Sequence, residues 1–149
     1  MKFVILAVGK GCRIVARTDD GAGDEDKCEL ERQLESFKKA GGSIAKDVDR
    51  MFAVFDYIAE HGRERATNFF HEANKKEGIY EFERGALRVY FSFVPYQGQL
   101  CVCSHVVRKK KQKAKTADVT AAKKAADEFR QAIDDRTLEF VTRSKGKKP

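Results

Sequence analysis

The sequence predicts an α+β fold in which helices cover one face of an antiparallel β-sheet. Two β-rich runs open the chain, two amphipathic helical segments follow, and three further strand-like runs lead into a last helix. At 149 residues, with 42% hydrophobic residues and eleven phenylalanines, the chain is long enough to bury one core. We therefore expect a single domain over residues 1–135, followed by a basic C-terminal tail over residues 136–149.

The first half of the chain predicts a hairpin followed by two helices. Residues 2–8 and 12–17 are β-rich and are separated by Gly-Lys-Gly, which favours a turn. After a polar loop, a helix is predicted to begin near Asp26, with Glu29 completing a variant of the capping box, and to end at the Gly-Gly pair. A second helix, capped by Ser43, extends to Gly62, because its apolar residues recur with a period of 3.6.

The second half predicts an antiparallel meander and a last helix. Strands are expected at residues 78–85, 86–94 and 99–107, because these runs are rich in aromatic and β-branched residues and short turns separate them. The last helix is predicted over residues 116–134. Its narrow apolar stripe consists of Val119, Ala122, Ala126, Phe129 and Ile133.

The surplus positive charge lies in the last third of the chain. Residues 1–100 carry 16 Lys and Arg against 17 Asp and Glu, a net charge of −1, whereas residues 101–149 carry 14 against 6, a net charge of +8. Six of these cations fall within residues 108–115, directly after an apolar strand pattern and with no acid among them. Such a segment favours contact with a polyanion over a purely solvated charge run.

The cysteines and the apolar runs limit the class of protein. Cys12, Cys28, Cys101 and Cys103 lack the spacing of a zinc site, so we expect buried free thiols. The apolar run at the start is too short for a secretory signal, and none approaches the ~20 apolar residues of a membrane span. We expect a soluble cytoplasmic protein that uses no metal and no cofactor.

Three segments of the chain resemble a known family. They are FFHEANKKEGIYEF, then LRVYFSFVPYQGQLCVCSHVVRKKKQKA, then the last helix. In this order they are similar to the RelE/HigB-like toxins of type II toxin–antitoxin systems, in the phage-derived HigB branch of the RelE/ParE superfamily. The matching positions are Gly78, Ile79, Tyr80, Glu81, Phe82, Arg88, Val89, Tyr90, Phe91, His105, Lys109 and Lys110. Glu83 stands where the family usually has arginine, with Arg84 next to it.

The resemblance implies a fold and an activity. The fold would be RelE/ParE-like, with N-terminal strands and a two-helix hairpin packed on an antiparallel sheet, and a C-terminal helix. The activity would be that of an mRNA interferase, a metal-independent endoribonuclease that cuts mRNA on the ribosome and inhibits translation. The implied partners are the ribosome, mRNA and a cognate antitoxin of the helix-turn-helix class, and no membrane.

The chemistry of RNA cleavage selects the candidate residues. Attack of a ribose 2′-OH on its phosphate needs a base, an acid and preorganised cations. We expect Arg88 and Arg84 to grip the phosphate, His105 to transfer protons, and Lys75 and Lys76 to line the same surface. The expected catalytic set is therefore Arg88, His105, Arg84 and Lys76.

Other residues are expected to bind RNA without reacting. Tyr90 can stack on a base, and the cations of the basic segment, Arg108, Lys109, Lys110, Lys111 and Lys113, can contact the RNA backbone. Two alternatives stay open. His105 shares a face with Cys101 and Cys103 by strand alternation and can be a core residue, and Tyr90 can equally belong to the core. His61 and His71 fall on predicted helical ground and are weaker candidates.

Two other functions compete with the nuclease. One is inhibition of DNA gyrase by a ParE-like toxin, which shares the fold and needs no nuclease centre; the mismatch at Glu83 favours it. The other is RNA binding without catalysis. Growth arrest that depends on Arg88 or His105 supports the nuclease, arrest through DNA damage supports gyrase inhibition, and absence of arrest supports the binding protein.

Overall fold

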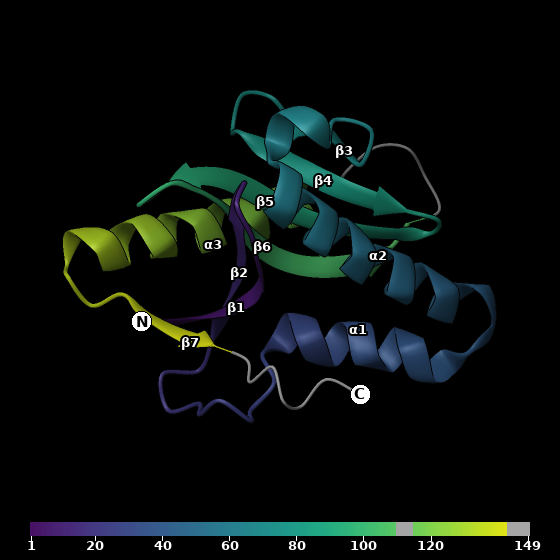
Figure 1. Ribbon diagram of the computed structural model, residues 1–149, viewed down its shortest axis with the longest axis horizontal. Coiled ribbons are helices and arrows are strands. Elements are labelled where there is room, and N and C mark those ends of the chain that lie inside the picture. The colour runs from purple at the N-terminus through teal and green to yellow at the C-terminus, as the bar shows by residue number, and fades with distance from the viewer. Residues whose placement is uncertain (110–114, 143–149) are drawn as a thin grey trace.

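The computed structural model describes residues 1–109 and 115–142 (Figure 1). Within these ranges the chain forms seven strands, three α-helices and a short 3-10 helix. In chain order they are β1 (Lys2–Val8), β2 (Arg13–Thr18), α1 (Glu29–Ala40), α2 (Gly42–His61), η1 (Arg63–Arg65), β3 (Phe70–Asn74), β4 (Ile79–Arg84), β5 (Leu87–Pro95), β6 (Gln99–Arg108), α3 (Thr116–Asp134) and β7 (Glu139–Thr142). The α+β class predicted from the sequence is confirmed. None of the described helices is long and apolar enough to cross a membrane.

The seven strands form one mixed sheet in the order β3-β4-β5-β6-β2-β1-β7. The antiparallel prediction is right for the β1–β2 hairpin and for the β3–β6 meander, but it is wrong at two junctions. β2 pairs with β6 in parallel, with Ile14 opposite Cys101, and β1 pairs with β7 in parallel. Both junctions join strands far apart in the sequence, and such long connections permit parallel pairing.

Helices cover both faces of the sheet, so the prediction of one covered face is wrong. α1 and α2 pack on one face, whereas α3 packs on β5 and β6 from the other (Figure 1). Both sets of alternate side chains on the central strands are apolar, which is the pattern of a strand buried on two sides. Phe91 and Cys101 belong to the core under α1 and α2, and Val94 and Val102 pack with Phe129 of α3.

Two consecutive helices form where the sequence predicts them, with different caps. Cys28 is the N-cap of α1, and its backbone N–H donates to Glu31 Oε1 over 2.9 Å, so the capping box lies two residues after the predicted one. Gly41, with φ of 75°, is both the C-cap of α1 and the N-cap of α2. Ser43 is therefore inside the helix and does not cap it.

The β1–β2 turn is held against the end of α2. The backbone N–H groups of Gly11 and Cys12 both donate to Ala59 O, over 2.8 and 3.0 Å. A Cβ on Gly11 would lie 2.2 Å from the backbone nitrogen of Gly62, so only glycine permits this approach. The turn thus supplies hydrogen bonds to the last turn of α2, where helix carbonyls lack partners.

The domain extends further than the predicted boundary at residue 135. β7 lies within the predicted tail 136–149 and pairs with β1, with Phe3 opposite Phe140. The Met1 ammonium also donates to Thr137 O over 2.8 Å. The four residues of β7 are too few to carry a strong strand signal on their own, and pairing with β1 stabilises the strand. Residues 143–149 lie outside the described part.

Candidate functional site

A polar network occupies the face of β3, β4 and β5 that does not contact α2. Its members come from neighbouring strands as direct cross-strand partners: His71 lies opposite Glu81, Glu81 opposite Tyr90, and Glu83 opposite Arg88. Residues paired in this way share a face with their Cβ atoms about 4.5–5.5 Å apart. We call this set, completed by Lys109 after β6, the sheet-face network: His71, Glu81, Glu83, Arg88, Tyr90 and Lys109.

Glu81 is the buried centre of the sheet-face network. Its side chain is only 2% exposed, and its Oε1 lies 2.5 Å from His71 Nε2 and 3.2 Å from Lys109 Nζ. The Tyr90 hydroxyl is also hydrogen-bonded to Glu81, and burial, followed by the nearby carboxylate, raises the pKa of Tyr90. A buried carboxylate is tolerated only when it is paired and hydrogen-bonded, so these three partners make Glu81 a fixed anionic anchor.

The rim of the network combines a histidine, a carboxylate and a guanidinium, of which the Arg88 side chain is only 13% exposed. The side chains of His71 and Glu83 are 48% and 46% exposed, and His71 Nδ1 lies 3.4 Å from Glu83 Oε1. Arg88 Nη2 donates to Glu83 Oε2 over 2.8 Å, and its Nη1 donates to the carbonyls of Gly85 and Leu87. His71 thus has a carboxylate at each ring nitrogen.

Arg88 carries an unsatisfied donor. Its Nε is buried without a hydrogen-bond partner in the described part of the chain. A buried N–H without a partner is unfavourable by about 1–3 kcal/mol. Because this atom is buried, it is a cost to the fold in this structure and is not a donor open to a substrate.

His105 lies on the other side of the sheet from the cysteines. Strand alternation placed it with Cys101 and Cys103, but the β5–β6 register shifts between Val89 and Phe91, so two residues of β6, Ser104 and His105, oppose one residue of β5. Such a bulge reverses the alternation. The side chain is consequently partly buried beside α3 rather than in the core that contains the two cysteines.

His105 is held by three partners. Its ring stacks on Tyr90 at 5.3 Å, and Nε2 lies 2.8 Å from Asp118 Oδ1 at the start of α3. A carboxylate can only accept, so Nε2 donates to it and Nδ1 is left to accept from the Ser104 hydroxyl, 2.8 Å away. Through Tyr90 the imidazole joins the sheet-face network, but its side chain is only 19% exposed, against 48% for His71.

Several predicted site residues lie elsewhere. Arg84 alternates with Glu83, so its side chain is on the α2 face, where the guanidinium lies 4.3 Å from the centre of the Phe69 ring. Lys75 and Lys76 are exposed in the β3–β4 turn. Arg84 and Arg88 therefore lie on opposite faces of the sheet. They cannot bind the same phosphate, contrary to the expectation from the sequence.

The predicted RNA-binding residues divide into three groups. Arg108 is exposed at the end of β6, whereas Lys109, with 7% exposure, points into the buried ion pair with Glu81. Tyr90 is a buried core residue and cannot stack on a base in this conformation. The other predicted cations, Lys110, Lys111 and Lys113, lie outside the described residues.

Sequence reasoning missed three members of the network. His71 was placed on helical ground, but it belongs to β3. Glu81 and Glu83 alternate with Phe82 on a strand, and this alternation of acids with an aromatic was the available signal that both face one side. The positions of His71 and Arg88 opposite these two acids can be inferred only once the pairing register of the strands is known.

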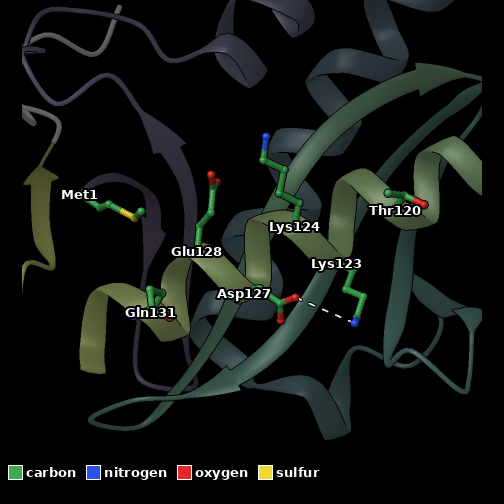
Figure 2. A pocket seen from close by; sticks show the side chains of 7 residues that line it. All are labelled: Met1, Thr120, Lys123, Lys124, Asp127, Glu128 and Gln131. Atoms are coloured by element: carbon green, nitrogen blue, oxygen red, sulfur yellow. Dashed lines mark ion pairs between the residues drawn. The ribbon is translucent and has the colours of Figure 1, made fainter. Parts of the chain in front are cut away.

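Apart from the sheet-face network, a depression lies along the outer side of α3, next to Met1 (Figure 2). Its volume is about 440 Å³, and the lining side chains shown in Figure 2 carry charges of both signs, with Lys123 and Asp127 paired at 4.0 Å. Its polar groups do not converge on one point in the way those of the sheet-face network do. In the described ranges, no group of three or more His, Cys, Asp or Glu side chains could hold a metal ion.

Comparison with models of known protein families finds no match to this chain, and no protein of curated function matches it. The candidate site therefore depends on the geometry and chemistry of the residues described above.

Proposed function

We propose that the protein is a metal-independent endoribonuclease of the RelE/HigB-like toxin class, which cleaves mRNA on the ribosome and stops translation. The observation that carries the proposal is the contact chain His71–Glu83–Arg88, with distances of 3.4 and 2.8 Å, in which His71 and Glu83 are about half exposed. These are the three kinds of group that RNA cleavage by a 2′-OH requires. The resemblance of residues 43–134 to these toxins supports the same conclusion.

The chemistry assigns a role to each rim residue. Glu83 takes the proton of the attacking 2′-OH, and His71 donates a proton to the 5′-oxygen as the P–O bond breaks. Arg88 stabilises the charge that develops on the phosphate through its guanidinium, which already donates to Glu83. The products are a 2′,3′-cyclic phosphate and a free 5′-hydroxyl. Glu81 holds His71 from the buried side.

The wider proposal includes partners and location. The basic segment begins at Arg108, the last residue of β6, and its charge suits an RNA backbone. We propose that the protein acts in the cytoplasm, on ribosomes that are translating mRNA, and that a cognate antitoxin neutralises it.

The test is cleavage of a translated mRNA. The chain is expressed without any antitoxin, or added to programmed ribosomes, and cuts are mapped by primer extension. We expect cuts that require translation, a reduction of roughly 10²–10³-fold in cleavage for Arg88→Ala, and one of roughly 10²-fold for His71→Ala.

Two control variants match these changes. Arg84→Ala removes an arginine from the same hairpin but from the opposite face, and His61→Ala removes an exposed histidine at the end of α2. Both should cleave like the wild type. Growth arrest with intact mRNA, or full cleavage by folded Arg88→Ala, would contradict the proposal.

A non-catalytic RNA-binding function is the second candidate. It is favoured by the internal ion pairs of Arg88 with Glu83 and of Lys109 with Glu81, which can serve the stability of the sheet alone. In that case wild type and Arg88→Ala would bind RNA equally, and neither would produce cuts.

A further inference from the structure

α2 and the β3–β4 hairpin enclose a small apolar pocket on the face opposite the sheet-face network. The cavity has a volume of about 270 Å³, and we call it the α2 pocket. Its lining consists of Arg50, Ala53, Val54, Tyr57, Phe69 and Arg84. Because Arg84 and Glu83 are neighbours on β4 with side chains on opposite faces, the α2 pocket is separate from the proposed nuclease site.

The floor of the α2 pocket exposes aromatic surface. Tyr57 is 39% exposed, and its ring meets Phe69 edge-on with 5.2 Å between ring centres. Exposed apolar surface next to a concave site is typical of protein interaction surfaces, and tyrosine and arginine are enriched among residues that dominate binding.

The rim of the α2 pocket is cationic. The guanidinium of Arg84 lies over Phe69, and that of Arg50 stands 3.4 Å from Asp47 Oδ1 with most of its side chain exposed. Asp47 is itself buried and also accepts from the backbone N–H of Ala86, so it is shared between two donors. Two guanidinium groups thus flank an apolar floor, which is complementary to carboxylates on either side of an apolar group.

We propose that the α2 pocket binds an acidic segment of a partner protein, which inserts one bulky apolar side chain between Tyr57 and Phe69 while its carboxylates pair with Arg50 and Arg84. The volume suits a single side chain rather than a folded surface. Extended contact with nucleic acid would use the surplus cations of the chain, which lie mainly after residue 100. The α2 pocket has an apolar lining with a basic rim instead, and this combination favours an acidic peptide.

The test uses synthetic peptides and the full chain. One series carries a single leucine, phenylalanine or tryptophan between glutamates, and a matched series has lysines in place of the glutamates. Binding is followed by fluorescence anisotropy, and the contact surface is mapped by NMR shifts of backbone amides. We expect the acidic series alone to bind, with the largest shifts around Ala53, Tyr57 and Phe69.

Two variants locate the binding. Arg84→Glu reverses the charge at the rim, and Ala53→Glu fills the pocket from an exposed helical position while keeping both arginines. Each should weaken binding by about tenfold or more. Arg130→Glu on α3 makes the same change of net charge at a site on the other face and should leave the affinity unchanged.

The outcomes separate this proposal from the nuclease. Absence of binding by every acidic peptide, equal binding of the lysine series, or binding that survives both variants would overturn it. Shifts of the same amides on addition of single-stranded RNA, with no peptide binding, would show a nucleic-acid surface instead. Because Arg84→Glu leaves the sheet-face network intact, it should keep any mRNA cleavage, so either proposal can fail alone.

Discussion

Replacement of Lys109 by methionine tests whether the buried ion pair stabilises the sheet. Methionine keeps an unbranched apolar stem and removes the ammonium that lies 3.2 Å from Glu81 Oε1. Loss of one partner of a buried pair is unfavourable by about 3–5 kcal/mol, because the other charge stays buried. Since His71 and Tyr90 continue to contact Glu81, we expect the low end, about 3 kcal/mol.

The assay is urea unfolding followed by circular dichroism. At a slope of about 1.5–2 kcal/mol per molar urea, the midpoint of Lys109→Met should fall by about 1.5–2 M. Lys123→Met is the matched control, because Lys123 pairs with Glu77 at 3.3 Å but is 51% exposed, and its loss should change stability by less than about 1 kcal/mol. Adding Glu81→Gln to Lys109→Met should recover part of the loss.

Two results would refute this reasoning. One is a loss below about 1 kcal/mol for Lys109→Met, which would place the pair among the weak surface ion pairs. The other is a double variant whose loss equals the sum of the two single losses, because residues in one buried network should be coupled.

Gly11→Ala should lower the free energy of unfolding by about 3–5 kcal/mol, because the new Cβ would meet the backbone of Gly62 at 2.2 Å and separate two N–H donors from Ala59 O. Gly21→Ala, where a Cβ has no neighbour within 4 Å, should stay within about 0.5 kcal/mol in the same urea titration. Cys28 contributes to the pH dependence of stability, because burial raises its pKa from 9.0 to about 11, and burial raises the pKa values of Cys101 and Cys103 as well. An acid with a raised pKa in the folded state holds its proton longer there, so stability should decline between pH 9 and 11 as the unfolded thiol ionises. Cys28→Ser should remove up to about 2–3 kcal/mol of that decline, and an equal decline in the variant would contradict the assignment.

Local sequence patterns predicted the elements with the strongest periodicity. The last helix was predicted at residues 116–134, where α3 lies, and β4, β5 and β6 were each predicted to within a residue or two. β3 was missed because most of its five residues are polar or small, and β7 because it has only four residues. Both are edge strands, and edge strands owe their conformation to the neighbour with which they pair.

The candidate site was predicted only in part, for a related reason. Arg88 was found from its own residue type and the alternation of β5. The partners of Arg88 and the position of His105 depend on registers between strands, including the bulge at Ser104, and no residue type marks that bulge in the sequence. The parallel pairing of β2 with β6, which brings the two halves of the sheet together, is likewise a long-range contact.

The pairing of β1 with β7 has a consequence for synthesis of the protein. β1 leaves the ribosome long before β7, so one of its two edges stays open until residues 139–142 have also emerged. An open strand edge can pair with a strand of another chain, so a nascent or truncated chain is exposed to misassembly for most of its synthesis. The strands that carry the sheet-face network emerge before α3, and therefore before Asp118 can bind His105. A ribosome-bound chain thus presents the network face before the helix that packs beside it has folded.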